Sequence, residues 1–372
     1  MALFPSTIAM GDAFCNRDKE RQLLKQYIKH QRHVVLMAPR RYGKTSLINQ
    51  VLIEQKSLYG IMELTMATSI EDVERIILKY VGQLLHSLLP KTIKAKQSLL
   101  KLFKWLNPEI VLTVAGQKLI FHPDQTTLSP TENISEMLIK LDSAAKAVEK
   151  NVVLCIDEFQ QITEIKPDYV IEAAIRHAMQ YSKHVSYIFS GSNRHLLLDM
   201  FNDKNRPFYN SCEIMQINRI AKADYELFIQ KAAEKQWKKQ LSESVLEAIF
   251  RLSELHPSYI NRICGYFWLT NEFPSQTAVE QFWENFVKSK HAELAENVLK
   301  LSKNQKKVLL YLAHHPTPNP SSHEVCQKIE LSEASTRQAV QTLLLKDYLF
   351  KDDEGLVRVL DPALKYFLQQ LP

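Results

Sequence analysis

The chain has 372 residues, 45% of them hydrophobic and 24% charged, so it is an ordinary globular protein long enough for two or three domains. Its formal net charge of +6 is compatible with a nucleic-acid partner but does not demand one. Five scattered cysteines without metal-ligand spacing argue against a disulfide scaffold, and no apolar run approaches the roughly 20 residues of a membrane span. Because no basic segment precedes the apolar N-terminal residues, we expect no signal peptide and a cytoplasmic location.

An amphipathic helix is predicted within residues 14–32, ahead of the first strong motif. That motif is an apolar strand at 33–37, a turn through Gly43, Lys44 and Thr45, and an apolar helix. This order is typical of a phosphate-binding loop, whose backbone N–H groups and helix dipole attract phosphate. We expect Lys44 to reach the terminal phosphates of a nucleotide and the Thr45 hydroxyl to bind Mg²⁺. The predicted nucleotide-binding residues of the loop are Ala38, Pro39, Arg40, Arg41, Tyr42, Gly43, Lys44, Thr45 and Ser46.

Several elements separate this loop from the next motif. A second strand is predicted at 58–66 and a helix at 70–89. Residues 91–106 are basic and amphipathic, and their lysines are better explained as a solvated face than as a binding surface. A β-hairpin is predicted over 109–123, inside a long insertion, and a helix follows at 131–149.

The second strong motif is a continuous apolar run at 151–156 that ends in two carboxylates, Asp157 and Glu158. Such a run predicts a buried parallel strand, and ligands bind at the carboxyl ends of strands in open α/β sheets. An acidic pair after a strand is by itself more often a surface turn, but beside a phosphate-binding loop the catalytic interpretation is favoured. We predict that Asp157 binds Mg²⁺ together with Thr45, and that Glu158 polarises the attacking water. The predicted catalytic residues are Lys44, Asp157 and Glu158.

A helix at 168–182 leads to another apolar strand at 185–193, which ends in the small polar residues Ser190 to Asn193. These side chains either sense the terminal phosphate or form a capped turn into the next helix, and the sequence leaves both interpretations open. A last strand is predicted at 213–220. Strands that alternate with helices predict an α/β fold, a parallel sheet with helices on both faces.

The remaining chain is helical up to a terminal two-stranded element. Helices are predicted over residues 222–236, 241–254, 257–270, 275–290, 303–314 and 333–347, and Ser321-Ser322 caps a further short helix between the last two. Short strands at 348–350 and 357–360 flank an acidic turn, so that helices followed by a two-stranded wing indicate a winged helix.

Together these motifs resemble the archaeal-type ATPase family, in the STAND branch of the AAA+-like P-loop NTPases. The resemblance covers nearly the whole chain. It is carried by the following residues: Phe14, Arg17 and Glu20, the loop from Pro39 to Ser46, the hairpin 109–123, Asp157-Glu158-Phe159, Ser190-Gly191-Ser192, Met200-Phe201, Pro207 and Tyr209, His256-Pro257 and Tyr259, and Asp361-Pro362. Three positions depart from the pattern: Asn16 and Ala38 replace glycines, and no arginine follows Tyr209.

The resemblance implies a P-loop ATPase core at 1–220 with a hairpin insertion near 107–123, a helical lid at 221–295, and a winged-helix domain at 296–372. It implies ATP and Mg²⁺ as cofactors. It also adds Arg17, Ser192, His256 and Pro257 to the expected nucleotide-binding residues.

The resulting hypothesis is a cytoplasmic ATPase that hydrolyses ATP and acts as a nucleotide-controlled switch, passing its state to a winged helix that binds protein or DNA. Arg194 and Arg206 are candidates for a charge-stabilising finger, supplied in cis or by a neighbouring subunit of an oligomer. The alternative is a DNA-binding regulator in which ATP is a structural or conformational ligand. A small-molecule kinase is a third hypothesis, disfavoured by the absence of a row of phosphate-gripping arginines in the lid.

Overall fold

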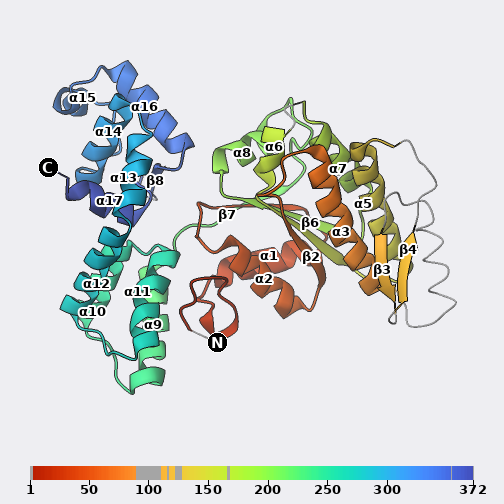
Figure 1. The fold of residues 1–372 in the computed structure, drawn as a ribbon, viewed down its shortest axis with the longest axis horizontal. Coiled ribbons are helices and arrows are strands. Elements are labelled where there is room, and N and C mark those ends of the chain that lie inside the picture. The colour runs from red at the N-terminus through yellow and green to blue at the C-terminus, as the bar shows by residue number, and fades with distance from the viewer. Residues whose placement is uncertain are drawn as a thin grey trace. The chain divides into compact units, whose positions relative to one another are not determined.

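The computed structural model of the chain describes residues 3–88, 110–114, 117–121, 128–165, 168–352 and 354–371. The basic and amphipathic stretch at 91–106 lies outside these residues. The chain divides into two compact units (Figure 1). We call residues 17–40 and 44–218 the sheet unit, and residues 1–16, 41–43 and 219–372 the helical unit.

The sheet unit is built on a five-stranded sheet in the order β2-β5-β6-β1-β7, and every neighbouring pair is parallel. Its strands are β1 (Val34–Met37), β2 (Leu58–Glu63), β5 (Val152–Asp157), β6 (Val185–Gly191) and β7 (Glu213–Gln216). All residues of β1, β5 and β6 are buried, which explains why these strands read as continuous apolar runs rather than as alternating ones. The predicted α/β fold with a parallel sheet is confirmed.

Helices cover both faces of this sheet (Figure 1). Successive strand residues point to opposite faces, so Val35 and Met37 join one hydrophobic core with α3, α5 and α7, while α1 and α2 cover the other side. The helices of the sheet unit are α1 (Asp18–Lys29), α2 (Lys44–Gln55), α3 (Ile70–Leu88), α5 (Pro130–Ala147), η2 (Phe159–Gln161), α6 (Ile162–Ile165), α7 (Val170–Tyr181) and α8 (Arg194–Asn202). The predicted hairpin is present as β3 (Ile110–Val114) and β4 (Gln117–Phe121), which pair antiparallel.

The helical unit is mostly α-helical. Its elements are η1 (Gly11–Ala13), α9 (Lys222–Trp237), α10 (Glu243–Ser253), α11 (Pro257–Thr270), α12 (Gln276–Ser289), α13 (His291–Leu299), α14 (Lys303–His314), α15 (His323–Ile329), α16 (Glu333–Leu345), β8 (Leu349–Lys351), β9 (Val357–Val359) and α17 (Pro362–Gln369). Helices α13 and α17 were not predicted from the sequence. One hydrophobic core runs through the unit and includes Trp283 of α12, Leu309 of α14 and Phe367 of α17. Among the residues that the structure describes, no helix combines the length and the apolar character needed to cross a bilayer.

The last elements of the helical unit end in a small hairpin. After α14, α15 and α16, strands β8 and β9 pair antiparallel, with Leu349 opposite Val359. Side chains cap the helices at their N-termini: Ser302 forms a capping box on α14, and Asp361 accepts hydrogen bonds from the N–H groups of Ala363 and Leu364 in α17. These caps explain why α14 and α17 begin where they do.

Candidate functional site

The loop between β1 and α2 has the backbone geometry that a phosphate-binding loop needs. Gly43 has φ +89°, a left-handed conformation that side chains disfavour, and α2 begins at the next residue, Lys44. Arg41 is also left-handed, at φ +64°. Ala38 is fully buried and is not among the described residues with positive φ, so alanine is accommodated there without strain. The N-terminus of α2 therefore follows directly on the turn, where its free N–H groups favour an anion.

The Lys44 side chain folds back over its own loop. The residue is 6% exposed, and its Nζ donates a hydrogen bond to the carbonyl oxygen of Ala38 at 3.1 Å. Its positive charge also lowers the pKa of Glu158. A buried ammonium group at the N-terminus of a helix is suited to an anionic ligand.

Thr45 and Asp157 meet although 112 positions separate them. The Thr45 hydroxyl donates to Asp157 Oδ2 at 3.0 Å, and Ser190 Oγ donates to Asp157 Oδ1 at 2.6 Å. Strand β6, which carries Ser190, lies between β1 and β5 and so brings the three residues to one edge of the sheet. A carboxylate and a hydroxyl are ligands that suit Mg²⁺. In the described part of the chain no three His, Cys, Asp or Glu side chains gather as a metal site, so the remaining ligands would be water or nucleotide oxygens.

The carboxylate of Glu158 accepts three hydrogen bonds on one oxygen. Its Oε2 receives Gln160 Nε2 at 2.6 Å, Ser192 Oγ at 2.8 Å and the Ser192 N–H at 3.3 Å. Burial pushes the pKa of Glu158 upward, but these donors and the charge of Lys44 outweigh it and hold the pKa below its ordinary value. Glu158 is therefore ionised at neutral pH, as a general base must be.

Of the two interpretations that the sequence left open for Ser190–Asn193, the structure shows the capped turn into the next helix. Asn193 caps α8, because its side chain accepts the N–H of Leu196 at 3.1 Å. Ser192 instead bonds Glu158, and its Oγ also accepts Arg40 Nε at 3.4 Å. The structure thus links two predicted site residues, Glu158 and Arg40, through Ser192.

Gln160 is a site residue that the sequence analysis missed. Its Nε2 donates to Glu158 while its Oε1 lies against Gly191, where an added Cβ would be 1.9 Å away. A glycine inside a buried apolar strand often marks such a close approach, and this was the available signal.

We expect the substitution Gly191→Ala to displace Gln160 from Glu158 and to lower the free energy of unfolding by about 1–3 kcal/mol, as overpacking does. Urea unfolding measures this loss. The matched control is the same substitution in a Gln160→Ala background, where the glutamine no longer obstructs the new methyl group. An equal loss in both backgrounds would contradict the assignment.

Arg17 is the N-cap residue of α1, and groups of the sheet unit hold its side chain. It is 5% exposed, and its guanidinium donates to the carbonyl oxygen of Asn218 at 3.0 Å and to Glu20 at 3.1 Å. Asn16 and Arg17 are both left-handed, at φ +45° and +65°. Asparagine tolerates this conformation better than most residues, which explains how it replaces the glycine of the resembling family at position 16.

Arg206, one of the two finger candidates, is already engaged. It forms a buried ion pair with Glu172, with side-chain exposures of 8% and 2%, and it lies 4.7 Å from the ring of Tyr169. A buried carboxylate needs its counter-ion, so Arg206 is committed to Glu172. The finger assignment of Arg206 is therefore not supported, and Arg194 at the start of α8 stays a prediction.

His256 and Pro257 lie in the helical unit, where Pro257 is the first residue of α11. The His256 ring contacts the rings of Tyr42 and Tyr259, each with a centroid distance of 5.0 Å. Burial, followed by the charges of Arg219 and Arg41, lowers the pKa of His256 to about 3. The imidazole is therefore neutral at physiological pH.

The lowered pKa of His256 predicts that acid destabilises the folded protein. In the unfolded chain His256 binds a proton below about pH 6.5, whereas in the folded chain it stays neutral down to about pH 3. Stability falls as the pH drops between these values, by about 2 kcal/mol between pH 7 and pH 5 from this residue. Urea unfolding at pH 7 and at pH 5 measures the free energy of unfolding at each pH. His256→Gln should reduce the difference between these two free energies by about 2 kcal/mol. An unchanged difference would contradict the prediction.

The similarity of this chain to known proteins lies in its fold. No family model matches the sequence, and no curated protein matches it. Among solved structures, a Walker-type ATPase of Pyrococcus abyssi is 15% identical, with a TM-score of 0.71 over 99% of both chains. The Aeropyrum pernix ORC2 protein is 10% identical, with a TM-score of 0.55 over 95% of this chain and 93% of that one in its ADPNP–ADP complexes, and 0.51 over 99% and 97% in its ADP form. The chain has the fold of Walker-type ATPases.

Proposed function

We propose that this protein binds ATP with Mg²⁺ on the loop that follows β1, hydrolyses it, and acts as a nucleotide-controlled switch. One observation carries the proposal. Lys44 and Thr45 at the start of α2 share one edge of the sheet with Asp157 and Glu158 at the end of β5, and a direct hydrogen bond joins Thr45 to Asp157. Ligands of open parallel sheets bind at this edge.

Each residue has a role that follows from its position. The Lys44 ammonium, buried in the loop, stabilises negative charge on the phosphates. Thr45 and Asp157 hold Mg²⁺, which when bound neutralises phosphate charge. Glu158, ionised and beside them, accepts the proton of the attacking water.

The switch assignment depends on the second unit. We infer that residues 221–295 form the lid and 296–372 a winged helix, as the resemblance to the archaeal-type STAND ATPases implies. The succession of α14, α15, α16, β8 and β9 is compatible with a winged helix.

A protein partner fits this terminal module better than DNA. Along α16 the exposed charged residues are Glu333 and Arg337, so the helix carries no excess of positive charge. In the described part of the wing, Arg358 is paired with Asp352 at 2.5 Å and lies 3.7 Å from Glu354. Proteins bind the phosphate backbone of DNA with clustered lysine and arginine side chains that are not paired with acidic residues. Helix α16 and the described part of the wing present no such cluster.

ATP turnover by the purified full chain, with and without duplex DNA, tests these proposals. We expect Mg²⁺-dependent phosphate release that duplex DNA does not change. ATP with Mg²⁺ should also raise the melting temperature, because a ligand that binds the folded state stabilises it. Absence of both nucleotide binding and stabilisation would refute the ATPase proposal, and salt-dependent duplex binding would favour the DNA-binding alternative.

A further inference from the structure

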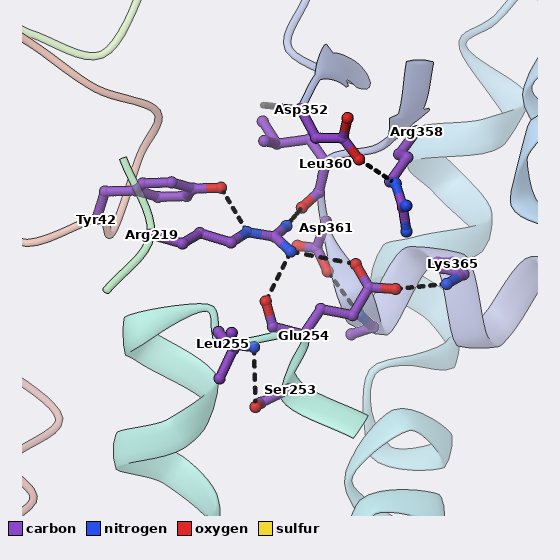
Figure 2. A network of polar contacts seen from close by, with 11 residues as sticks. Tyr42, Arg219, Ser253, Glu254, Leu255, Asp352, Arg358, Leu360, Asp361 and Lys365 are labelled. Carbon is purple, nitrogen blue, oxygen red and sulfur yellow. Dashed lines mark hydrogen bonds and ion pairs between the residues drawn. The ribbon is translucent and has the colours of Figure 1, made fainter. Parts of the chain in front are cut away.

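Arg219 lies just beyond β7 and connects three segments of the helical unit that are far apart in sequence (Figure 2). Its Nε donates to the Tyr42 hydroxyl at 3.0 Å, and its Nη2 donates to the carbonyl oxygen of Leu360 at 3.0 Å. Its Nη1 donates to Glu254 twice, to the carbonyl oxygen at 2.7 Å and to Oε2 at 3.2 Å. The guanidinium also lies 4.8 Å from the ring of Phe350 in β8.

The segment between α10 and α11, to which Arg219 donates hydrogen bonds, has an uncommon backbone conformation. Glu254 and Leu255 are both left-handed, at φ +47° and +59°. Two successive residues of this kind persist only where the surroundings hold them. The bonds from Arg219 to Glu254 do so, together with the Leu255 N–H, which donates to Ser253 Oγ at 3.3 Å.

A second route joins Tyr42 to the same end of the chain. The ring of Tyr42 contacts His256, and His256 contacts Tyr259. The Tyr259 hydroxyl bonds both carboxylate oxygens of Asp361 at 2.8 and 2.9 Å. Asp361 directly follows Leu360, the residue that Arg219 reaches, so both routes from Tyr42 end at the junction between β9 and α17.

Charges reinforce this junction. The Glu254 carboxylate that accepts Arg219 also pairs with Lys365 of α17 (Figure 2). Arg219 and Glu254 are only 17% and 16% exposed at their side chains, so solvent screens their interaction weakly. Only an arginine presents donors in several directions from one rigid plane, and a lysine at this position would lose part of the set.

We propose that Arg219 is a positioning residue that couples the conformation of the phosphate-binding loop to the wing of the terminal module. The inference rests on the proposed function, because it needs the loop to change when nucleotide is bound. Tyr42 lies between the left-handed residues Arg41 and Gly43 and two positions before Lys44. A rearrangement of this turn displaces the Tyr42 hydroxyl, and Arg219 then follows it or releases it. Either result changes how firmly Leu360 is held.

Hydrogen exchange of the full-length protein tests the coupling. The peptides to follow cover residues 349–360, with and without ATP and Mg²⁺ at a concentration that saturates each variant. In the wild type we expect nucleotide to change exchange in this wing at least threefold. Arg219→Lys should abolish most of that response and, already without nucleotide, should raise wing exchange. Tyr42→Phe, which removes only the hydroxyl group, should reduce the response of the wing as Arg219→Lys does. The double variant should lose little more of the response than Arg219→Lys alone.

The matched control is Arg251→Gln on the neighbouring helix α10, which removes an exposed ion pair with Glu280 of α12 and should respond as the wild type does. If exchange in the wild-type wing does not change when nucleotide binds, or if Arg219→Lys keeps the full wild-type response, this inference is wrong but the proposed function is not. A wild-type protein that binds no nucleotide would overturn the proposed function and this inference with it.

Discussion

The substitution Glu158→Gln should lower ATP turnover by about 10²–10⁴-fold, the range that general-base catalysis contributes, while ATP binding persists. The amide has the shape of the carboxylate and its oxygen still accepts the hydrogen bonds of Gln160 and Ser192. It no longer takes a proton from water. Phosphate release under saturating ATP, alongside titration of a fluorescent ATP analogue, measures the two quantities separately.

Glu164→Gln is the matched control, since Glu164 is an exposed carboxylate on the nearby helix α6. It should leave both turnover and binding as in the wild type. Full turnover by Glu158→Gln would refute the assignment of the base, and a parallel loss of binding would show that Glu158 acts on the ground state instead.

The substitution Lys44→Ala should weaken ATP binding on the order of 100-fold. Hydrogen bonds from a charged donor contribute about 1.5–3 kcal/mol each, and about 1.4 kcal/mol corresponds to a tenfold change in affinity. Lys44 is 6% exposed at the N-terminus of α2, so solvent compensates poorly for its loss. Isothermal titration with ATP and Mg²⁺ measures the change.

Lys29→Ala, at the exposed end of α1, is the control for removal of one positive charge. It should leave the affinity for ATP unchanged. Circular dichroism establishes that Lys44→Ala is folded, and wild-type affinity in a folded variant would place the nucleotide elsewhere.

Local sequence patterns were sufficient to predict those elements whose structure depends on a single short segment. The strands β1, β5 and β6 are buried on both faces, so their apolar runs predicted them directly. The Gly43 turn also follows from a few consecutive residues, since its left-handed backbone favours glycine. By contrast α13 and α17 are short, and α13 follows α12 after a single residue, so no clear boundary marked its start.

Contacts between distant segments were beyond the reach of such patterns. Gln160 carries no motif of its own, and its role appears only where β6 places Gly191 against it. From the sequence Arg206 looked like an unpaired cation, because its partner Glu172 lies 34 positions away on α7.

The sequence by itself determined which side chains are the candidates for handling phosphate, because Lys44, Thr45, Asp157 and Glu158 belong to short motifs whose chemistry depends on near neighbours. Only the tertiary structure decided how these residues are held and what they are joined to. The strand order brings Ser190 beside Asp157, and the Arg219 guanidinium gathers Tyr42, Glu254 and Leu360. The physical reason is that hydrogen bonds and ion pairs depend on distance in space, and the folding of the whole chain sets that distance.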